Sequence, residues 1–357
     1  MLSDNCYAVV MAGGAGTRLW PLSSKNKPKH LLKLFEGKCL IELTIEKLKD
    51  HVPDDRIIIL TSVNYKELTQ QMLTQIPPEN FICEPCVRDT ASAIGLAATV
   101  LKLRCKDATM IMLTADQIIE PADLFNAAIA NAANFLDTHP EMLVAFGVEA
   151  ASPNTIVGWQ KLGQSLGFQD CEVRKIVEFT EKPDSDTANK YMEQGDYCWN
   201  SGQFAWKAET ILQEINTHLP DATDILKQIG AEWNTSSRDQ VLKNLFPKMP
   251  TGSIDYMVMQ KTSSACSIFL PCSWEDMGTH AALAEKIGWK HKNNIISGKA
   301  VLTGSGNKVI ANTDQSVVAA LDNIIIVVTN NTVFVGDSYT DMKALIESVA
   351  KQAPEIL

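Results

Sequence analysis

The chain has 357 residues, a length that predicts one large domain with a smaller companion. Its 32 Lys and Arg residues against 42 Asp and Glu residues give a formal net charge of −10, which argues against a general nucleic-acid binder or a binder of anionic membranes. No apolar run approaches the roughly 20 residues of a membrane span, and the first residues lack the basic start and apolar core of a signal peptide. We therefore expect a cytoplasmic protein without nucleic-acid or membrane partners.

Short apolar runs alternate with amphipathic segments through the first third of the chain. This spacing predicts βαβ units, and hence a mainly parallel sheet with helices on both faces. The fold class is α/β. The expected strands lie at 7–11, 56–60, 81–85 and 108–113, and the expected helices lie near 40–50, near 64–75 and from about 89 onward.

Polar residues follow two of these expected strands. Asp89 or Thr90 can cap the helix that begins there, because both side chains accept hydrogen bonds from helix N-termini. Asp116 lies just past the carboxyl end of the strand expected at 108–113, where open α/β sheets bind their ligands.

The pattern of predicted strands and helices changes twice from residue 142 onward. First come β-rich pieces with helices near 184–195 and 208–233, which read as later strands of the same sheet. After residue 294, short strands with Gly, Asn and Asp turns run to a last helix near 340–350. We expect a catalytic domain at 1–290 and, at 291–357, a small C-terminal β domain or a solenoid-like tail.

The nine cysteines do not indicate a metal or redox site. Cys83 and Cys86 form a C-x-x-C, but no second pair or nearby histidine completes a zinc set. Reduced thiols in packing and loop positions are the expectation.

The stretch YAVVMAGGAGTRLWPLSSKNKPKH, at the first strand, carries the strongest local signal. From Gly14 the third glycine of a dinucleotide fingerprint is absent, and no lysine follows Gly16 as a P-loop requires. What remains is a glycine turn with Arg18 and Lys29, which suits the phosphates of a nucleoside triphosphate. A tight strand-to-helix turn with a surface arginine and lysine is the structural alternative.

This loop is the first of six motifs that follow one another along the chain. They are GGAGTRLWPLS with KPKHLL, EPCVRDTASAI, LTADQII, FTEKPD with WNSGQFAW, SIDYMVMQK, and WEDMGTHAAL, spread over about residues 7–290. Together they resemble the motifs of sugar-nucleotide pyrophosphorylases, and the Leu19-Trp20-Pro21 variant is similar to the mannose-1-phosphate guanylyltransferase branch.

The resemblance implies a Rossmann-like mixed sheet, the nucleotide-diphospho-sugar transferase fold. It also implies an enzyme, a Mg²⁺-dependent nucleotidyltransferase that makes GDP-mannose and pyrophosphate from GTP and mannose 1-phosphate. The family often forms dimers, so a homodimer is an expectation by analogy.

The resemblance also implies roles for individual residues. Nucleotide contacts are expected from Ala12, Gly13, Gly14, Gly16, Thr17, Glu84, Arg88, Asp89 and Thr90. Catalytic charge is expected from Arg18, Lys29 and Lys182, sugar contacts from Gly158, Glu181 and Asn200, and metal ligation from Asp116 and Asp276. Each has a plainer reading: the aspartates as helix caps or loop residues, EKP as a solvated turn, and Asn200 as a turn-stabilising residue.

Several positions depart from the family pattern. Val157, Trp159 and Gln160 stand where Tyr, Tyr and Ile are usual before the EKP strand, a segment that faces the sugar in the family. His30 replaces a usual glutamine and His280 a usual tryptophan. The altered segment before the EKP strand keeps open a pyrophosphorylase for a heptose or fucose 1-phosphate. Two alternatives of other classes are a non-catalytic sugar-nucleotide-binding regulatory homologue and a dinucleotide-dependent oxidoreductase, which the missing glycine disfavours.

Overall fold

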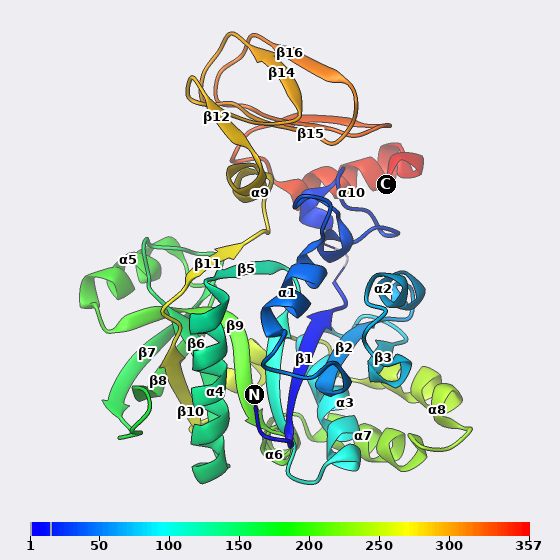
Figure 1. Ribbon diagram of the computed structural model, residues 1–357, viewed down its shortest axis with the longest axis vertical. Helices are drawn as coiled ribbons and strands as arrows, with labels where there is room; N and C mark the ends of the chain where they lie inside the picture. Colours follow the sequence, from blue (N-terminus) through cyan, green and yellow to red (C-terminus); the bar gives the residue numbers. More distant parts are fainter. Residues whose placement is uncertain (1, 15) are drawn as a thin grey trace. The chain divides into compact units, whose positions relative to one another are not determined.

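The computed structural model describes residues 2–14 and 16–357, which divide into two compact units (Figure 1). We call them the sheet unit and the solenoid unit. The sheet unit comprises residues 2–13, 46–114 and 119–274. The solenoid unit comprises residues 14, 16–45, 115–118 and 275–357. These units do not coincide with the expected domains 1–290 and 291–357, because the glycine loop packs with the C-terminal part of the chain.

The sheet unit is built on one nine-stranded sheet, in the order β3-β2-β1-β4-β9-β6-β10-β8-β7. Its strands are β1 (Cys6–Ala12), β2 (Ile57–Ser62), β3 (Phe81–Glu84), β4 (Thr109–Thr114), β6 (Leu143–Val148), β7 (Gly158–Ser165), β8 (Val173–Glu181), β9 (Tyr197–Lys207) and β10 (Ala265–Phe269). Strands β1, β2, β3 and β4 pair in parallel, whereas β9 runs antiparallel to both β4 and β6. The expected mixed Rossmann-like sheet is confirmed.

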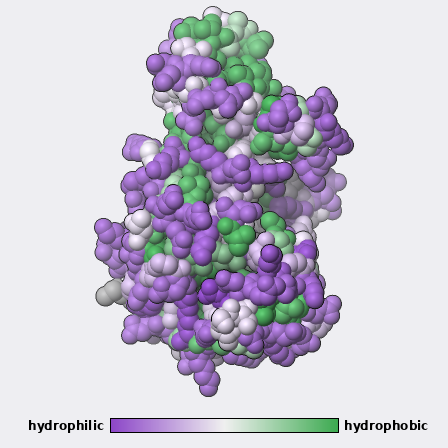
Figure 2. All heavy atoms as spheres, turned by 90° about the vertical axis from the view of Figure 1, so that its right-hand side faces the viewer, coloured by the Kyte–Doolittle hydropathy of each residue, from purple (hydrophilic) through white to green (hydrophobic). Residues whose placement is uncertain are grey.

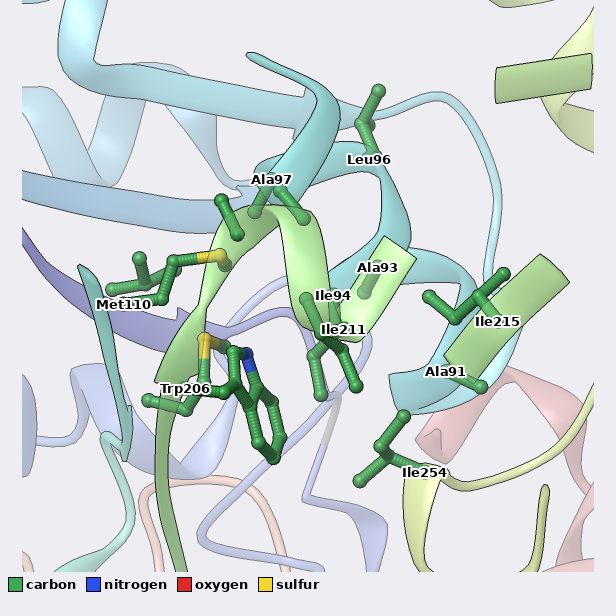
Figure 3. Close-up of a cluster of buried hydrophobic side chains, with 14 of the residues drawn as sticks. Ala91, Ala93, Ile94, Leu96, Ala97, Met110, Trp206, Ile211, Ile215 and Ile254 are labelled. Atoms are coloured by element: carbon green, nitrogen blue, oxygen red, sulfur yellow. The ribbon is translucent and has the colours of Figure 1, made fainter. Parts of the chain in front are cut away.

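Helices cover both faces of this sheet. Met110 and Met112 of β4 belong to a core with α3 and α6, and the alternation of strand side chains turns Ile111 to the opposite face. Figure 3 shows part of the α3 core, including Trp206 of β9. The helices of the chain are α1 (Leu40–Leu48), α2 (Lys66–Met72), α3 (Asp89–Arg104), α4 (Ala122–Thr138), α5 (Ser185–Gln194), α6 (Ala208–His218), α7 (Pro220–Glu232), α8 (Arg238–Leu245), α9 (His280–Ile287) and α10 (Met342–Gln352).

The helical stretch expected at 208–233 is two helices. Helix α6 ends at His218, and Pro220 is the first residue of α7. Proline has no backbone N–H to continue the first helix, but it fits the first turn of a new one.

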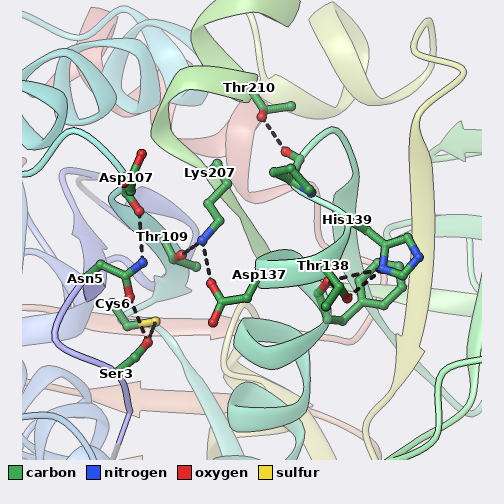
Figure 4. Close-up of polar contacts among 12 residues, drawn as sticks. Ser3, Asn5, Cys6, Asp107, Thr109, Asp137, Thr138, His139, Lys207 and Thr210 are labelled. Carbon is green, nitrogen blue, oxygen red and sulfur yellow. Dashed lines mark hydrogen bonds and ion pairs between the residues drawn. The ribbon is translucent and has the colours of Figure 1, made fainter.

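Polar contacts stabilise one end of the sheet. Lys207 donates to Asp137 at 2.6 Å and to Thr109 at 2.9 Å (Figure 4).

The C-terminal strands form a short β-solenoid, so the expected small β region is confirmed. Successive strands alternate between a parallel sheet of β13, β15 and β17 and a parallel pair of β14 and β16. Strands β12 and β18 add antiparallel edges. The bounds are β12 (Trp289–His291), β13 (Asn294–Ser297), β14 (Lys299–Leu302), β15 (Lys308–Ala311), β16 (Ser316–Ala319), β17 (Ile325–Val328) and β18 (Val333–Gly336).

Buried asparagines fix the turns of the solenoid. Asn294 accepts from the Asn307 backbone N–H at 2.9 Å, and Asn307 in turn accepts from Ile324 at 3.1 Å. Each side-chain amide satisfies backbone groups that the turn leaves unpaired, a role asparagine fills well.

Both faces of the β13–β15–β17 sheet are buried. Val309 and Ile326 face the interior of the solenoid, whereas Ile310 and Ile325 face a second core that contains Leu19 of the glycine loop. Some apolar side chains remain outside: Val301 and Val318 are 63% and 78% exposed, and green atoms gather over the solenoid in Figure 2. Among the described residues, no helix is both long and apolar enough to cross a membrane.

Strands β5 (Gln117–Glu120) and β11 (Ser273–Asp276) form a separate two-stranded sheet. The chain passes from one unit to the other within each of these strands.

Candidate functional site

The glycine loop of the solenoid unit is shaped by one glycine. Gly16 has φ +62°, and a Cβ added there would lie 2.4 Å from Cβ of Lys29. The Ser23 hydroxyl donates to the Gly16 carbonyl at 2.6 Å and fixes the turn. Only glycine meets both demands, since it alone adopts this conformation freely and leaves room for a close neighbour. The loop thus presses against the backbone of Lys29.

Lys29 brings the two predicted metal ligands together. Its ammonium lies 2.8 Å from Asp116 and 3.6 Å from Asp276, and the residue is only 8% exposed. Burial raises the pKa of the Asp276 carboxyl and Asp116 raises it further, while Lys29 and Arg18 oppose the rise. We call Lys29, Asp116 and Asp276 the charged cluster.

One apolar core holds the charged cluster in place, although its members are far apart in sequence. Leu19 from the glycine loop, Met277 next to Asp276 and Phe334 from β18 all belong to it. The Trp20 indole also donates to the carbonyl of Ile356 at 3.3 Å, which ties the loop to the end of the chain. Packing, rather than local sequence, therefore sets the geometry of the cluster.

The charged cluster fits a magnesium ion that would share its coordination with phosphates. Asp116 and Asp276 supply hard carboxylate oxygens that converge on one point of positive charge. No group of three or more His, Cys, Asp or Glu side chains able to hold a metal occurs within 2–14 and 16–357. Mg²⁺ typically binds through one or two carboxylates plus substrate phosphates. The residues present match that mode, and their metal role stays a prediction.

The two histidines that depart from the family pattern are buried packing residues. Burial lowers the pKa of His30 to about 4 and also lowers that of His280, so both are neutral at pH 7. His280 stacks on Phe334 with ring centroids 5.1 Å apart. Of the other predicted loop residues, Thr17 and Arg18 are exposed, and a Cβ at Gly14 would meet nothing within 4 Å.

The sheet unit holds the predicted nucleotide contacts at the ends of β1 and β3. A Cβ added to Gly13 would come 3.0 Å from a carboxyl oxygen of Glu84, so the glycine lets this side chain approach the end of β1. Burial, helped by Asp89, raises the pKa of Glu84 to about 8. Ala12 is buried, and its carbonyl accepts from Thr61 at 2.9 Å.

The start of α3 is held by a neighbouring loop, and the expected helix cap does not form. Asp89 has φ +65° and accepts from the next residue, Thr90, at 2.7 Å. The Thr90 hydroxyl accepts from the Ile254 N–H at 2.8 Å instead of from its own helix. Arg88 donates to the carbonyl of Pro247 and to Thr251. Tertiary contacts thus replace local capping here.

The predicted sugar contacts lie together at β7, β8 and β9. A Cβ added to Gly158 would lie 2.6 Å from a Glu181 carboxyl oxygen and 3.2 Å from Cβ of Asn200. Glu181 forms an ion pair with Lys182, which has φ +49° at the end of β8. The structure therefore gathers Gly158, Glu181, Lys182 and Asn200 into one group, and their roles toward a sugar phosphate stay predictions.

Sequence reasoning gives no role to Asp255, which belongs to this group. It begins a π-helix (Asp255–Met259), a form often found at functional sites, and accepts from the Asn200 amide at 3.1 Å. Burial and the nearby Glu181 raise the pKa of Asp255 to about 7. The signal for it in the sequence is the motif SIDYMVMQK, in which Asp255 is the one carboxylate.

The altered strand β7 has a clear structural arrangement. Trp159 is fully buried, donates to the carbonyl of Asn154 at 2.8 Å and lies edge-on to Trp199, so it serves the core. Gln160 is also fully buried and donates to Asn200 at 3.0 Å.

Comparison with known proteins decides the family. The model of the nucleotidyl transferase family matches residues 7–289. The chain belongs to this family. The match covers both the glycine loop and the segment that contains Asp276, and so it includes every residue of the two groups described above.

Individual nucleotidyl transferases agree with the motifs. A mannose-1-phosphate guanylyltransferase of Escherichia coli (strain K12) is 33% identical over 307 residues, which is 84% of this chain and 64% of the relative. A protein of the same name from Klebsiella pneumoniae is 34% identical over 305 residues, again 84% and 64%. The chain therefore spans about 64% of the length of these relatives. The predicted resemblance to this branch is confirmed.

A solved structure matches nearly the whole chain. This crystal structure, described as a mannose-1-phosphate geranyltransferase from Thermus thermophilus, has a TM-score of 0.83 at 29% identity and covers 97% of this chain and 99% of its own. The match extends over the C-terminal residues as well. The expected nucleotidyltransferase fold is confirmed.

Proposed function

We propose that this nucleotidyl transferase makes GDP-mannose and pyrophosphate from GTP and mannose 1-phosphate, with Mg²⁺ as cofactor. In this reaction an oxygen of the sugar phosphate attacks the α-phosphorus of GTP. The bond from that phosphorus to the β-phosphate oxygen breaks, and pyrophosphate leaves. Such a step depends on positioning and charge neutralisation more than on covalent help from the protein.

The observation that carries the proposal is the charged cluster. A lysine and two aspartates from three distant segments meet behind a glycine loop, and the lysine is nearly buried. Burying the charge of Lys29 is costly unless the charge is paired or serves a ligand. Lys29 and the exposed Arg18 are suited to offset the charge of the leaving pyrophosphate.

Asp116 and Asp276 would hold the magnesium ion. When bound, the ion supplies positive charge to the phosphate oxygens. Lys29 would keep both carboxylates oriented, since its ammonium contacts them both. Gly16 and Gly14 would let backbone N–H groups approach the phosphates.

The group in the sheet unit would bind the sugar phosphate. Lys182 supplies a positive charge for the phosphate, while Glu181 and Asn200 accept and donate hydrogen bonds to hydroxyls. The names of the relatives in Escherichia coli and Klebsiella pneumoniae favour mannose as the sugar and guanine as the base. Because residues of β7 depart from the family pattern, the identity of the sugar is the part of the proposal that most needs a test.

A pyrophosphate-release assay tests the proposal. Purified protein is mixed with each of four nucleoside triphosphates, Mg²⁺ and a panel of mannose, glucose, fucose and heptose 1-phosphates. Release with GTP and mannose 1-phosphate, at a rate well above every other pair, is the expected result.

Each other outcome selects a different conclusion. Faster release with fucose or heptose 1-phosphate overturns mannose as the substrate. No release with any pair overturns the enzyme and favours a sugar-nucleotide-binding homologue, which titration with GDP-mannose would reveal as binding without turnover. Removal of metal with EDTA and its return tests the magnesium requirement in the same assay.

A further inference from the structure

A chain of hydrogen bonds runs through the interior of the sheet unit to the predicted sugar contacts. The Ser267 hydroxyl donates to Gln160 at 2.7 Å, Gln160 donates to Asn200 at 3.0 Å, and Asn200 donates to Asp255 at 3.1 Å. The thiol of Cys198 also donates to Gln160, at 3.7 Å. The chain joins four elements: β10, β7, β9 and the π-helix.

The neutral members of this chain are shielded from solvent. Gln160 is 0% exposed, and Ser267 and Asn200 are 4% and 6% exposed. A buried amide that loses a partner has no water to replace it, so each bond of the chain depends on its neighbour being correctly oriented.

The direction of the chain follows from its last member. Above its pKa of about 7, Asp255 is ionised and can only accept hydrogen bonds, so it requires the nitrogen of the Asn200 amide to face it. The oxygen of Asn200 then faces Gln160 and requires a donor there. Gln160 meets this demand with its amide nitrogen, and its own oxygen is held by Ser267 and Cys198.

We propose that Gln160 is a positioning residue that fixes the orientation of the Asn200 amide and so determines which hydrogen bonds Asn200 offers to the sugar. This inference rests on the proposed function. An aliphatic side chain at position 160 leaves the Asn200 oxygen without its donor, and the amide is then free to rotate between two orientations. One of these turns an oxygen toward Asp255, where two acceptors repel each other.

The first test is Gln160→Leu, with Gln160→Met as a second variant that fills the same space more flexibly. At pH 8, where Asp255 is ionised, we expect the KM for mannose 1-phosphate to rise about tenfold, the value of one hydrogen bond to a charged network. The KM for GTP should stay within about twofold and kcat should change little. Asn80→Leu is the matched control, because Asn80 is a similarly buried amide that donates to the carbonyls of Asp55 and Ile57. It should lower the melting temperature to a similar degree without changing the sugar KM.

A double-mutant cycle separates positioning from general destabilisation. If Gln160 acts through Asn200, then Gln160→Leu has no further effect on the sugar KM once Asn200 is changed to Ala. A purely structural role would give the same increment in both backgrounds. Independent effects in the cycle, or an unchanged sugar KM in both Gln160 variants, would overturn the inference.

The assay also distinguishes failure of this inference from failure of the proposed function. Pyrophosphate release by the unmodified protein with GTP and mannose 1-phosphate must be seen first. If another sugar 1-phosphate is the substrate, the same variants are measured with that sugar. If no pair reacts, the proposed function fails, and titration of GDP-mannose into the Gln160 and Asn200 variants still tests the positioning role by binding affinity.

Discussion

The charged cluster and the group in the sheet unit hold their carboxylates in different ways. The charged cluster of the solenoid unit holds two partly exposed carboxylates beside a buried lysine that contacts both. The group in the sheet unit places Asp255 against the neutral amide of Asn200 and the like-charged Glu181, with Lys182 as a more distant counter-charge. Burial raises the pKa of Asp276 and Asp255 alike, but a directly contacting cation opposes the rise only at Asp276.

This difference suits different ligands. A cluster in which a lysine opposes the rise in the pKa of Asp276 suits a cation and its phosphates. A carboxyl that accepts from a neutral amide, with a pKa near 7, suits recognition of uncharged hydroxyl groups, where direction matters more than charge. The four predictions that follow test whether the two groups are distinct in this way.

The largest effect is expected for Asp276→Asn in the charged cluster. The amide oxygen carries no net charge and is a weaker ligand for Mg²⁺ than the carboxylate, so several kcal/mol of charge stabilisation and on the order of 10³-fold of kcat should be lost. Pyrophosphate release measures the loss, and circular dichroism checks the fold. Glu275→Gln is the matched control, since Glu275 is the adjacent residue and pairs with Lys286 at 3.1 Å. Near-normal activity in Asp276→Asn would remove Asp276 from the metal site.

Phe334→Ala tests whether the C-terminal strands support the charged cluster. Phe334 is 5% exposed in the core that contains Leu19, so its truncation should cost about 3–5 kcal/mol of stability. The KM for GTP should rise as the glycine loop loosens, while the KM for the sugar phosphate stays constant. Calorimetry and steady-state kinetics measure both effects. Val318→Ala on the exposed face of β16 is the control and should change neither. A destabilised Phe334→Ala variant with an unchanged KM for GTP would contradict the link.

Asp255→Asn tests the prediction that nearby groups do not fully offset the cost of burying the negative charge of Asp255. Its folded-state pKa of about 7 lies above the usual 3.8, so its contribution to stability is fully present below pH 3.8 and is lost as pH rises through 7. The amide does not ionise, so the variant should gain stability relative to the unmodified protein from pH 4 to 7, reaching about 2–4 kcal/mol above pH 7. Thermal melts at pH 5 and pH 8 measure the gain, and sugar affinity should fall in the same variant. An equal melting-temperature difference at both pH values would show that Asp255 is ionised throughout.

Much of the fold is predictable because its signals are local. The apolar runs of β1, β2 and β4 and the helix that begins at Asp89 follow directly from the spacing of their side chains. The two-helix split at Pro220 and the uncapped start of α3 do not follow from that spacing. The first depends on a single proline, and the second on a loop more than 150 residues away that bonds to Thr90.

The candidate site divides in the same way. Motifs identify Lys29, Asp116 and Asp276, but only packing shows that one lysine contacts both carboxylates. Gln160 stands out in the sequence as a departure, and its contact with Asn200 depends on the pairing of β7 with β9. The union of the glycine loop with the solenoid core is not predictable, because no local pattern links Leu19 to Phe334.

The smallest effect is expected for Lys182→Ala. Lys182 is half-exposed, so water screens its charge, and its loss should raise the KM for the sugar phosphate about tenfold with little change in kcat. Because Lys182 has φ +49°, Lys182→Gly gives the same loss of charge without backbone strain and should show the same KM. Lys190→Ala on exposed α5 serves as the control for lost positive charge in the sheet unit. If the KM for GTP rose instead, Lys182 would bind the triphosphate. The proposal that the sheet-unit group binds only the sugar phosphate would then be wrong for this residue.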